Sequence, residues 1–269
     1  MSTAPLPPVL LVGCGKMGGA LLSGWLARGI AEAVAVDPRA DAAAGPGVRV
    51  VPDAASLPAD FRPAAVLLAI KPQEAPRAMP EYGRFARDGA LFVSIMAGHT
   101  VSGMAAMLGA PAAIVRAMPN TPAAIGQGFT AAFAGPDVSG ERRDLADALL
   151  SAVGEVDWVA EEGLLDAVTA VSGGGPAYVF LLAELLEAAA RDQGLPADLA
   201  RRMARATVAG SGALLAQSPE DAAVLRKNVT SPKGTTERAL AVLMAEEAWP
   251  ALVRRAVAAA TERSRELAG

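Results

Sequence analysis

The sequence contains one cysteine, one histidine and few aromatic residues. Because Cys14 has no second cysteine to pair with, it cannot form an intrachain disulfide, which is typical of a protein from a reducing compartment. The first nine residues, MSTAPLPPV, contain neither a basic leader nor an apolar signal core. These features together predict a cytoplasmic protein.

Charge of one sign is not concentrated anywhere along the chain. The formal net charge is −4, and aromatic residues make up only 4% of the sequence. Proteins that bind nucleic acids usually carry a basic patch, often with aromatic side chains on which bases stack. We therefore expect no nucleic-acid partner, and we predict no metal site.

A long uninterrupted apolar run is also missing. The longest one, Ala177–Ala183 with Leu185 and Leu186, is broken by Glu184 and Glu187. It falls short of the roughly 20 clean residues that cross a bilayer. We therefore expect a buried helix here and no membrane partner.

The order of structural signals divides the chain into two parts. Short β-rich runs alternate with helical stretches up to about Val159, as βαβ units and a parallel sheet require. Helix-forming residues dominate from there to the end. We predict an α/β domain over residues 1–160 and an all-α domain over residues 161–269. The expected strands are Val9–Val12, Val34–Asp37, Val66–Ile70, Leu91–Ile95, Ile114–Ala117, Thr130–Phe133 and Val156–Val159, and their apolar character predicts burial on both faces.

Three helix starts can be read in the C-terminal part. Pro176 suits the first turn of a helix, and Ser218, which is followed by acidic residues, has the chemistry of an N-cap. A third helix is expected to begin at Thr235 or Thr236.

A glycine motif joins the first strand to the first helix. The strand Val9–Val12 runs into Gly13-Cys14-Gly15-Lys16-Met17-Gly18, which is followed by an apolar-periodic helix over Ala20–Leu26. In G-x-G-x-x-G, the glycines allow a tight turn, a close approach of the backbone to a pyrophosphate, and tight packing of helix on sheet. We predict a Rossmann-type dinucleotide-binding domain, with Cys14 as a small filler and Gly13, Gly15, Lys16, Met17 and Gly18 at the cofactor.

Two residues with opposite preferences follow the second expected strand. Asp37 suits the 2′-hydroxyl of NAD, whereas Arg39 suits the 2′-phosphate of NADP. An aspartate at the end of a strand is also a common turn residue. The cofactor can therefore be NADPH or NADH.

Later strands also end in turns that contain glycine or proline. Ligands of open α/β sheets lie beyond the carboxyl ends of the strands, so these turns are expected to line the cofactor cleft. The alternative is that they are ordinary loops. The cofactor contacts predicted here are Ala69, Ile70, Lys71, Pro72, Met96, Ala97, Gly98 and Asn120.

The chain resembles the pyrroline-5-carboxylate reductases over essentially its whole length. The resemblance is carried by GCGKMG, AIKPQ, SIMAG, RAMPNTP, AVSGGGPAY (170–178) and NVTSPKGTT (228–236). Two positions depart from the family pattern: Gly174 stands where a serine is usual, and Lys233 stands where a glycine is frequent. These departures affect the expected local hydrogen bonding and loop shape.

The resemblance implies reduction of 1-pyrroline-5-carboxylate, a cyclic imino acid, to L-proline by NADPH or NADH. It assigns substrate binding to Ser231, Thr235 and Thr236 and cofactor contact to Asn228. Read from the residues alone, Ser231, Gly234 and the two threonines form either an anion site for the substrate carboxylate or an ordinary helix entry. Lys233 either adds charge to this site or is a solvated loop lysine.

An imine is basic enough to arrive protonated, so the enzyme needs no strong general acid. The resemblance points to Thr236 as the residue that orients the proton at the ring nitrogen. The only histidine, His99, is the alternative acid, although its Ala-Gly-His-Thr setting resembles a loop.

Two other functions are weighed against this one. A β-hydroxyacid-type dehydrogenase would need a catalytic lysine on a C-terminal helix, but no lysine lies between Lys71 and Lys227. A non-catalytic dinucleotide sensor would not need the paired threonines. The apolar residues of 178–186 cover more than one helix face, and with the resemblance this predicts a homodimer that can assemble further.

Overall fold

The computed structural model describes residues 6–39 and 47–268. The first five residues, which belong to the segment expected to lack a signal, lie outside the described part of the chain. The chain forms two compact units, one of residues 1–173 with 260–269 and the other of residues 174–259. The strands end near the boundary predicted at residue 160, but the compact first unit continues to Gly173 and includes the last ten residues.

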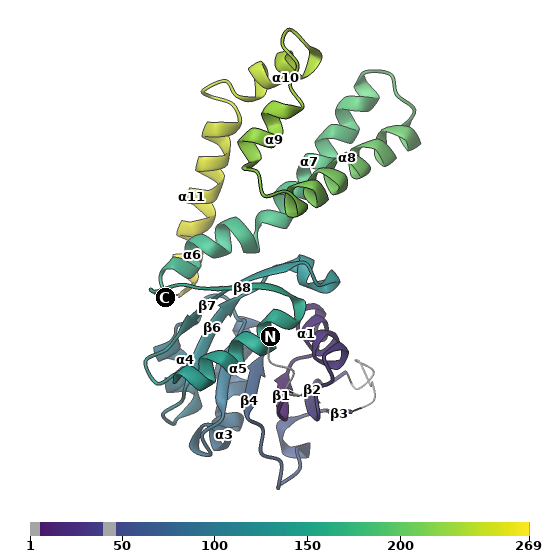
Figure 1. The fold of residues 1–269 in the computed structure, drawn as a ribbon. Helices are drawn as coiled ribbons and strands as arrows, with labels where there is room; N and C mark the ends of the chain where they lie inside the picture. Colours follow the sequence, from purple (N-terminus) through teal and green to yellow (C-terminus); the bar gives the residue numbers. More distant parts are fainter. Residues whose placement is uncertain (1–5, 40–46, 269) are drawn as a thin grey trace. The chain divides into compact units, whose positions relative to one another are not determined.

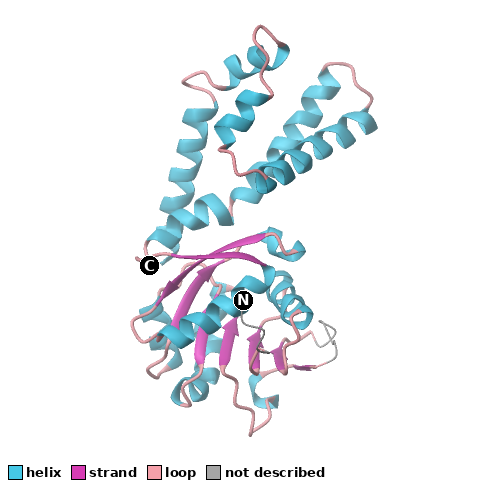
Figure 2. Cartoon of the chain, viewed as in Figure 1, coloured by secondary structure: helices cyan, strands magenta, loops and turns pink. Residues whose placement is uncertain are grey.

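The first unit contains one sheet of eight strands in the order β3-β2-β1-β4-β5-β6-β7-β8 (Figures 1 and 2). The strands β3, β2, β1, β4, β5 and β6 run parallel to one another, β7 is antiparallel to β6, and β8 is parallel to β7. The strands are β1 (Val9–Val12), β2 (Ala33–Val36), β3 (Val48–Val51), β4 (Ala65–Leu68), β5 (Leu91–Ser94), β6 (Ile114–Met118), β7 (Gly128–Ala134) and β8 (Gly154–Trp158).

Successive residues of each central strand enter two different cores. Val9 and Leu11 of β1 pack with Leu21 and Trp25 of one layer, whereas Leu10 packs in the other. Helices therefore cover both faces of the sheet, which explains why the central strands are apolar throughout, as predicted. The first layer contains α1 (Lys16–Ala27) and α5 (Gly140–Leu150), and the second contains α3 (Gly83–Arg87) and α4 (Val101–Leu108). Short helical segments complete the unit: α2 (Ala75–Ala78), α6 (Leu164–Val168), η1 (Ala54–Ser56), η2 (Pro72–Glu74), η3 (Met79–Tyr82), η4 (Thr121–Ile125), η5 (Ser151–Val153) and the π-helix η6 (Thr169–Gly173).

The second unit is helical throughout, which confirms an α/β domain followed by an all-α region. Pro176 lies in the first turn of α7, as expected. Another predicted start is also confirmed, since α10 begins at Thr235. The helices are α7 (Gly175–Asp192), α8 (Ala197–Gln217), α9 (Ala222–Asn228) and α10 (Thr235–Leu243), and α11 (Trp249–Ala268) runs from this unit into the first.

The predicted N-cap at Ser218 is wrong. Helix α8 continues to Gln217, Ser218 follows its last turn, and Asp221 is the N-cap of α9. The Ser218 hydroxyl instead accepts a hydrogen bond from the Glu220 backbone N–H over 3.1 Å. The residue therefore forms a local turn between two helices.

Helix α7 is not buried within its own chain. Phe180 is 67% exposed and Leu185 is 56% exposed. The helical stretch Leu164–Asp192 is long and apolar enough to cross a membrane by length and composition alone, so the sequence-based exclusion by length was too strict. Such a helix can equally be the core helix of an assembly, in which a second surface covers it.

Candidate active site

Six parallel strands end at one edge of the sheet, and the loops that follow them form the candidate cofactor site of the first unit. Strand β1 lies between β2 and β4, where the chain order changes direction, and ligands of open α/β sheets bind at such a point. The structure places at this edge the predicted cofactor residues Gly13–Gly18, Asp37, Arg39, Ala69–Pro72, Met96–Gly98 and Asn120.

The glycine loop between β1 and α1 is fixed by close packing. Gly13 has φ = 91°, and a Cβ atom there would lie 2.7 Å from the Ala69 carbonyl oxygen. A Cβ atom at Gly18 would lie 2.1 Å from the Gly13 carbonyl oxygen. A Cβ atom at Gly15, by contrast, would meet nothing within 4 Å. The outer glycines are therefore required by the fold, and Gly15 faces open space that a ligand can occupy.

The start of α1 offers free backbone donors. Its N-cap is Gly15, so no side chain of the N-cap residue hydrogen-bonds the first turn. The exposed Lys16 is the first helical residue, and Met17 is half-buried beside it. Uncapped N–H groups and the positive end of the helix dipole are the usual features of a pyrophosphate site. These residues fit a dinucleotide.

Asp37 lies directly after β2 and is almost fully buried. Its Oδ2 atom accepts a hydrogen bond from the Cys14 backbone N–H over 2.8 Å, and its Oδ1 atom accepts one from the Arg39 backbone N–H over 2.9 Å. The carboxylate thus connects the end of β2 to the glycine loop. Burial raises the pKa of Asp37, but the hydrogen bonds from Arg39 and Cys14 outweigh burial and hold the pKa below its usual value.

Arg39 pairs with the same carboxylate. Its Nε atom lies 3.3 Å from Oδ1 of Asp37, and its Nη2 atom lies 3.5 Å from Oδ2. The neighbouring Cys14 is buried, as expected of a filler, and its pKa is raised by burial and by the Asp37 charge. A thiol with a raised pKa is a poor nucleophile.

The loop after β4 packs under the glycine turn. Ala69 contacts the positions of Gly13 and Gly18, and its backbone N–H donates to the Val12 carbonyl oxygen over 2.8 Å. Ile70 is half-buried next to it, and the exposed Lys71 precedes η2.

His99 ties two of these loops together. Its Nε2 atom donates to the Pro72 carbonyl oxygen over 2.8 Å. Since a carbonyl oxygen can only accept, this nitrogen carries the hydrogen. The ring is thereby used to join the loop after β5 to the loop after β4, which gives His99 a structural role.

The loop after β5 presents mainly backbone. Met96 is 2% exposed and belongs to the core, whereas Ala97 beside it is half-buried and is open to a ligand. Gly98 has φ = 75°, and a Cβ atom there would lie 2.8 Å from the Leu267 carbonyl oxygen. The glycine at 98 is therefore explained by packing against the end of the chain.

Both polar atoms of the Asn120 side-chain amide already form hydrogen bonds. Its Oδ1 atom accepts a hydrogen bond from the Phe129 N–H over 2.9 Å, and its Nδ2 atom donates to the Ser172 hydroxyl over 3.1 Å. Sequence reasoning missed Ser172, which lies in the π-helix η6. Single π-turns are frequent at functional sites. The three consecutive glycines that follow Ser172 were the available signal.

The second unit has a candidate substrate site of its own, at the entry to α10. Gly234 is the N-cap of this helix, and its N–H donates to the Ser231 carbonyl oxygen over 3.0 Å. Lys233 is left-handed, with φ = 60°, and its N–H donates to Oε2 of Glu237 over 2.7 Å. The loop therefore folds back on the first turn of the helix.

The hydroxyl groups of this loop are open to solvent. Thr235 and Thr236 are the first two residues of α10, and Ser231 lies in the preceding loop; all three are exposed. Asn228 ends α9, and its Nδ2 atom donates to Oε2 of Glu220 over 3.3 Å. The arrangement offers hydroxyl groups and helix N–H groups to one small anion.

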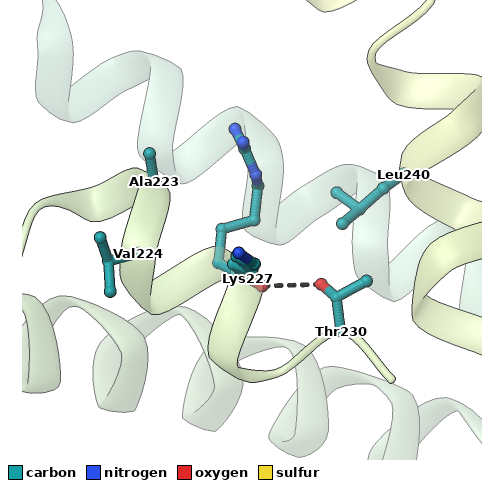
Figure 3. Close-up of a pocket in the computed structure, with 6 residues that line it drawn as sticks. Ala223, Val224, Lys227, Thr230 and Leu240 are labelled. Atoms are coloured by element: carbon teal, nitrogen blue, oxygen red, sulfur yellow. Dashed lines mark hydrogen bonds between the residues drawn. The ribbon is translucent and has the colours of Figure 1, made fainter. Parts of the chain in front are cut away.

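A hollow of about 450 Å³ lies beside this loop, between α9 and α10 (Figure 3). Figure 3 shows Thr230 next to it; the Thr230 hydroxyl donates to the Arg226 carbonyl oxygen. The hollow contains none of the predicted substrate residues. It is lined by Ala223, Val224, Arg226, Lys227, Thr230 and Leu240.

Comparison with known proteins identifies the family. Residues 162–267 match the model for pyrroline-5-carboxylate reductase dimerisation. Pyrroline-5-carboxylate reductase of Pseudomonas aeruginosa is 39% identical, with 97% of each chain covered. The chain belongs to the pyrroline-5-carboxylate reductase family. The reductase of Synechocystis is 43% identical, with 75% of this chain and 74% of the relative covered.

Solved structures of reductases agree with this assignment. The pyrroline-5-carboxylate reductase of Coxiella burnetii has a TM-score of 0.90 at 31% identity, covering 98% of this chain and 99% of its own. That of Plasmodium falciparum, solved with NADP bound, has a TM-score of 0.83 at 25% identity and covers 99% of this chain and 100% of its own. Residues 8–98 also match the model for F420-dependent NADP oxidoreductases. The fold and family predicted from the motifs are thus confirmed.

Proposed function

We propose that the protein reduces 1-pyrroline-5-carboxylate to L-proline with NADPH or NADH, the last step of proline biosynthesis. The observation that carries the proposal is the combination, in a member of this reductase family, of an open glycine loop at Gly15 with the exposed hydroxyl groups at the start of α10. Neither alternative function, a hydroxyacid dehydrogenase or a sensor, accounts for both.

The first unit would hold the dinucleotide. Backbone N–H groups at the start of α1 would bind the pyrophosphate, and Asp37 and Arg39 would face the adenosine ribose. The reduced nicotinamide would supply a hydride to the imine carbon. The remaining contacts proposed are Gly13, Lys16, Met17, Gly18, Ala69, Ile70, Lys71, Pro72, Met96, Ala97, Gly98, Asn120 and Asn228. Met96 is 2% exposed, so a contact there requires a local movement, and for Asn120 a contact requires that the amide share its present hydrogen bonds.

The second unit would hold the substrate by its carboxylate. The N–H groups of the first turn of α10 and the hydroxyl groups of Ser231 and Thr235 are suitable donors. A Cβ atom at Gly234 would lie 3.0 Å from the Ser231 carbonyl oxygen, so the glycine allows the loop to pack closely before the helix. Carboxylates are stabilised at such a position by the helix dipole.

Thr236 would act at the ring nitrogen. The reaction consumes one NAD(P)H and one proton and forms a C–H and an N–H bond, giving L-proline and NAD(P)⁺. An iminium ion already carries the N–H hydrogen, so the chain only has to orient it. A threonine hydroxyl can accept a hydrogen bond from the iminium N–H or donate one to the neutral imine.

The family also supports a proposal for the assembly and the setting. The match to a dimerisation model supports a homo-oligomer, and we propose a homodimer or a higher assembly that covers the exposed apolar helices. We further propose that the enzyme works in the cytoplasm, with no membrane or nucleic-acid partner. The helix α7 would then be covered by protein.

The test is the activity of Thr236→Ala with 1-pyrroline-5-carboxylate and NADPH. We expect kcat to fall by about 100-fold, since positioned proton donors contribute at least this much. The Kd of NADPH, measured without substrate, should change little. Thr236→Ser keeps the hydroxyl and should recover most of the rate. An unchanged kcat in Thr236→Ala would remove Thr236 from the mechanism, and a wild-type enzyme inactive on this substrate would refute the proposed function.

A further inference from the structure

Strand β6 carries a buried arginine that the proposed reaction does not use. Arg116 is 2% exposed and lies opposite Ser94, which is fully buried in β5. Its Nη1 atom lies 3.2 Å from Oε1 of Glu162, while its Nε and Nη2 atoms have no hydrogen-bond partner among the residues that the structure describes. A buried cation is costly without a partner. Arg116 therefore depends on Glu162, and the ion pair keeps the Glu162 carboxylate in one place.

Glu162 connects this strand to the beginning of α4. Its Oε1 atom also accepts a hydrogen bond from the Val101 backbone N–H over 2.8 Å, and Val101 is the first residue of α4. A carboxylate at a helix N-terminus satisfies an N–H group that has no partner within the helix, and the helix dipole favours the negative charge. Glu162 thus caps α4 from a segment 61 residues away along the chain, and both segments belong to the first unit.

The capped helix ends the loop after β5, which contains proposed cofactor contacts. At the start of this loop, the Met96 N–H donates to the Ser94 hydroxyl over 3.2 Å. In its middle, His99 donates to the loop after β4. At its end, the Val101 N–H is held by Glu162. The half-buried Ala97 lies between these anchors.

The place of this loop in the sheet assigns it to one end of a dinucleotide. In doubly wound domains the pyrophosphate lies at the glycine turn after the first strand, and the adenosine ribose lies at the end of the second strand. Here β2 lies on one side of β1, and β4 and β5 lie on the other side. The loop after β5 is therefore on the nicotinamide side.

We propose that Glu162 is a positioning residue for the nicotinamide end of the cofactor and that it acts through the Val101 N–H on the loop after β5. Arg116 fixes the carboxylate, and the carboxylate fixes the start of α4. The loop then presents Ala97 in a constant position. This inference rests on the proposed function, since it concerns how the same site holds its cofactor.

The test replaces both members of the ion pair together, because removing Glu162 alone would leave Arg116 as an uncompensated buried charge. Arg116→Met with Glu162→Gln keeps an oxygen that can accept from the Val101 N–H. Arg116→Met with Glu162→Met removes this oxygen at nearly the same side-chain length. Calorimetry measures Kd for the dinucleotide that the wild type binds more tightly and for its adenosine half, 5′-AMP for NADH or 2′,5′-ADP for NADPH.

The double variant with Glu162→Met should raise the Kd of the dinucleotide by about tenfold, the size of one lost hydrogen bond. The Kd of the adenosine nucleotide should change by less than about twofold, because that nucleotide does not reach the loop after β5. With Glu162→Gln, both Kd values should stay within about threefold of the wild type. A merely structural pair would move both ligands together or neither, so the difference between the ligands is the readout.

Val101→Pro tests the same hydrogen bond from the donor side, and it does not depend on the folding of the double variants. Proline lacks the N–H group and suits the first position of a helix, which Val101 occupies. Val101→Ala is the control, because it also shortens the side chain but keeps the N–H group. Val101→Pro should bind the dinucleotide about tenfold more weakly than Val101→Ala, with equal affinities for the adenosine nucleotide.

Two results would overturn the inference. One is an equal Kd for the dinucleotide within each matched pair of variants, and the other is a parallel loss of the adenosine nucleotide. Both leave the proposed function intact as long as the wild-type protein reduces 1-pyrroline-5-carboxylate. A wild-type protein that binds neither dinucleotide would instead refute the proposed function itself.

Discussion

The two compact units differ in what they do with their large apolar side chains. In the first, Trp25 and Phe92 are completely buried, and the two cores on the faces of the sheet are closed by helices of the same chain. In the second, which is described in full, the buried hydrophobic residues are the small Ala190, Ala200 and Ala204. Many large apolar side chains of that unit are exposed, among them Phe180 and Leu185, and none is fully buried.

This difference indicates that the first unit can be stable by itself, whereas the second needs another surface to cover its apolar side chains. Exposed apolar surface on this scale generally marks an interface, because monomeric proteins rarely expose such continuous patches. The match of residues 162–267 to a dimerisation model supports an interface in the same segment. We infer that the first unit closes its core alone, whereas the second completes its core with another copy.

The largest expected effect comes from placing a charge in the apolar face of α7. Phe180 is 67% exposed in the single chain, and Phe180→Asp should abolish assembly if a second copy covers it. Burying one unpaired carboxylate costs several kcal/mol, roughly the stability of a whole interface core. Light scattering coupled to gel filtration would show a monomer in place of the oligomer, while the first unit should still bind NADH.

Ile125→Asp is the matched control for that variant. Ile125 is 74% exposed, belongs to the first unit and lies in η4. Because single exposed apolar residues are ordinary on protein surfaces, we expect the assembly to be unchanged. An oligomer that survives Phe180→Asp would show that α7 is not covered, and the contrast between the units would lose its explanation.

The next effect in size tests the closed core of the first unit. Trp25 is fully buried, and its Nε1 atom donates to the Leu149 carbonyl oxygen over 2.8 Å. Trp25→Ala should lower the free energy of unfolding by about 3–5 kcal/mol, the usual cost of a large cavity in a core. Denaturant titration would measure it. Trp158→Ala should cost less than half as much, because Trp158 is only half-buried although its Nε1 atom also donates, to Asp147. Equal losses would mean that burial does not decide the cost.

Sequence patterns predicted those features of the first unit that depend on neighbours along the chain. The glycine motif could be recognised because strand, turn and helix follow one another directly along the chain. The central strands could be predicted from their apolar composition. The strand Val48–Val51 was missed because it is the edge strand of the sheet and carries the exposed Arg49, so it lacks that apolar signature. The strand is stabilised by its pairing with β2, which cannot be recognised from the sequence of the strand itself.

The limits of the sequence reading lie in partners that are distant along the chain. The position of Asp37 could be predicted, but not that its carboxylate accepts from Cys14, 23 residues away, nor that Asn120 binds Ser172, 52 residues away. Ser218 shows a local limit, because the same hydroxyl can cap a helix or close a turn. Helix α8 extends to Gln217, so Ser218 lies directly after it and its hydroxyl closes a turn. Only the folded chain resolves such choices.

The smallest expected effect concerns Lys233, which is the positive-φ residue other than glycine among those that the structure describes. A left-handed conformation costs a residue with a Cβ atom about 1–2 kcal/mol, and glycine avoids this cost. Glycine also loses more backbone entropy on folding, which cancels about 0.5–1 kcal/mol of that gain. Lys233→Gly should therefore raise the free energy of unfolding by about 0.5–1 kcal/mol in denaturant titrations. Lys233→Ala is the control, because it removes the charge but keeps the Cβ atom, and it should give no such gain.

The same two variants test whether Lys233 serves the candidate anion site in the second unit. Its side chain is exposed, and its backbone N–H is already committed to Glu237. If the lysine is only a solvated loop residue, neither variant should change the KM for the imino acid by more than about twofold, the range of a surface charge. An equal rise of KM in both variants would place the ammonium group at the substrate carboxylate. The strained backbone at 233 would then be retained for the charge that it presents, in contrast to Gly13 of the first unit, where the same backbone region carries no side chain.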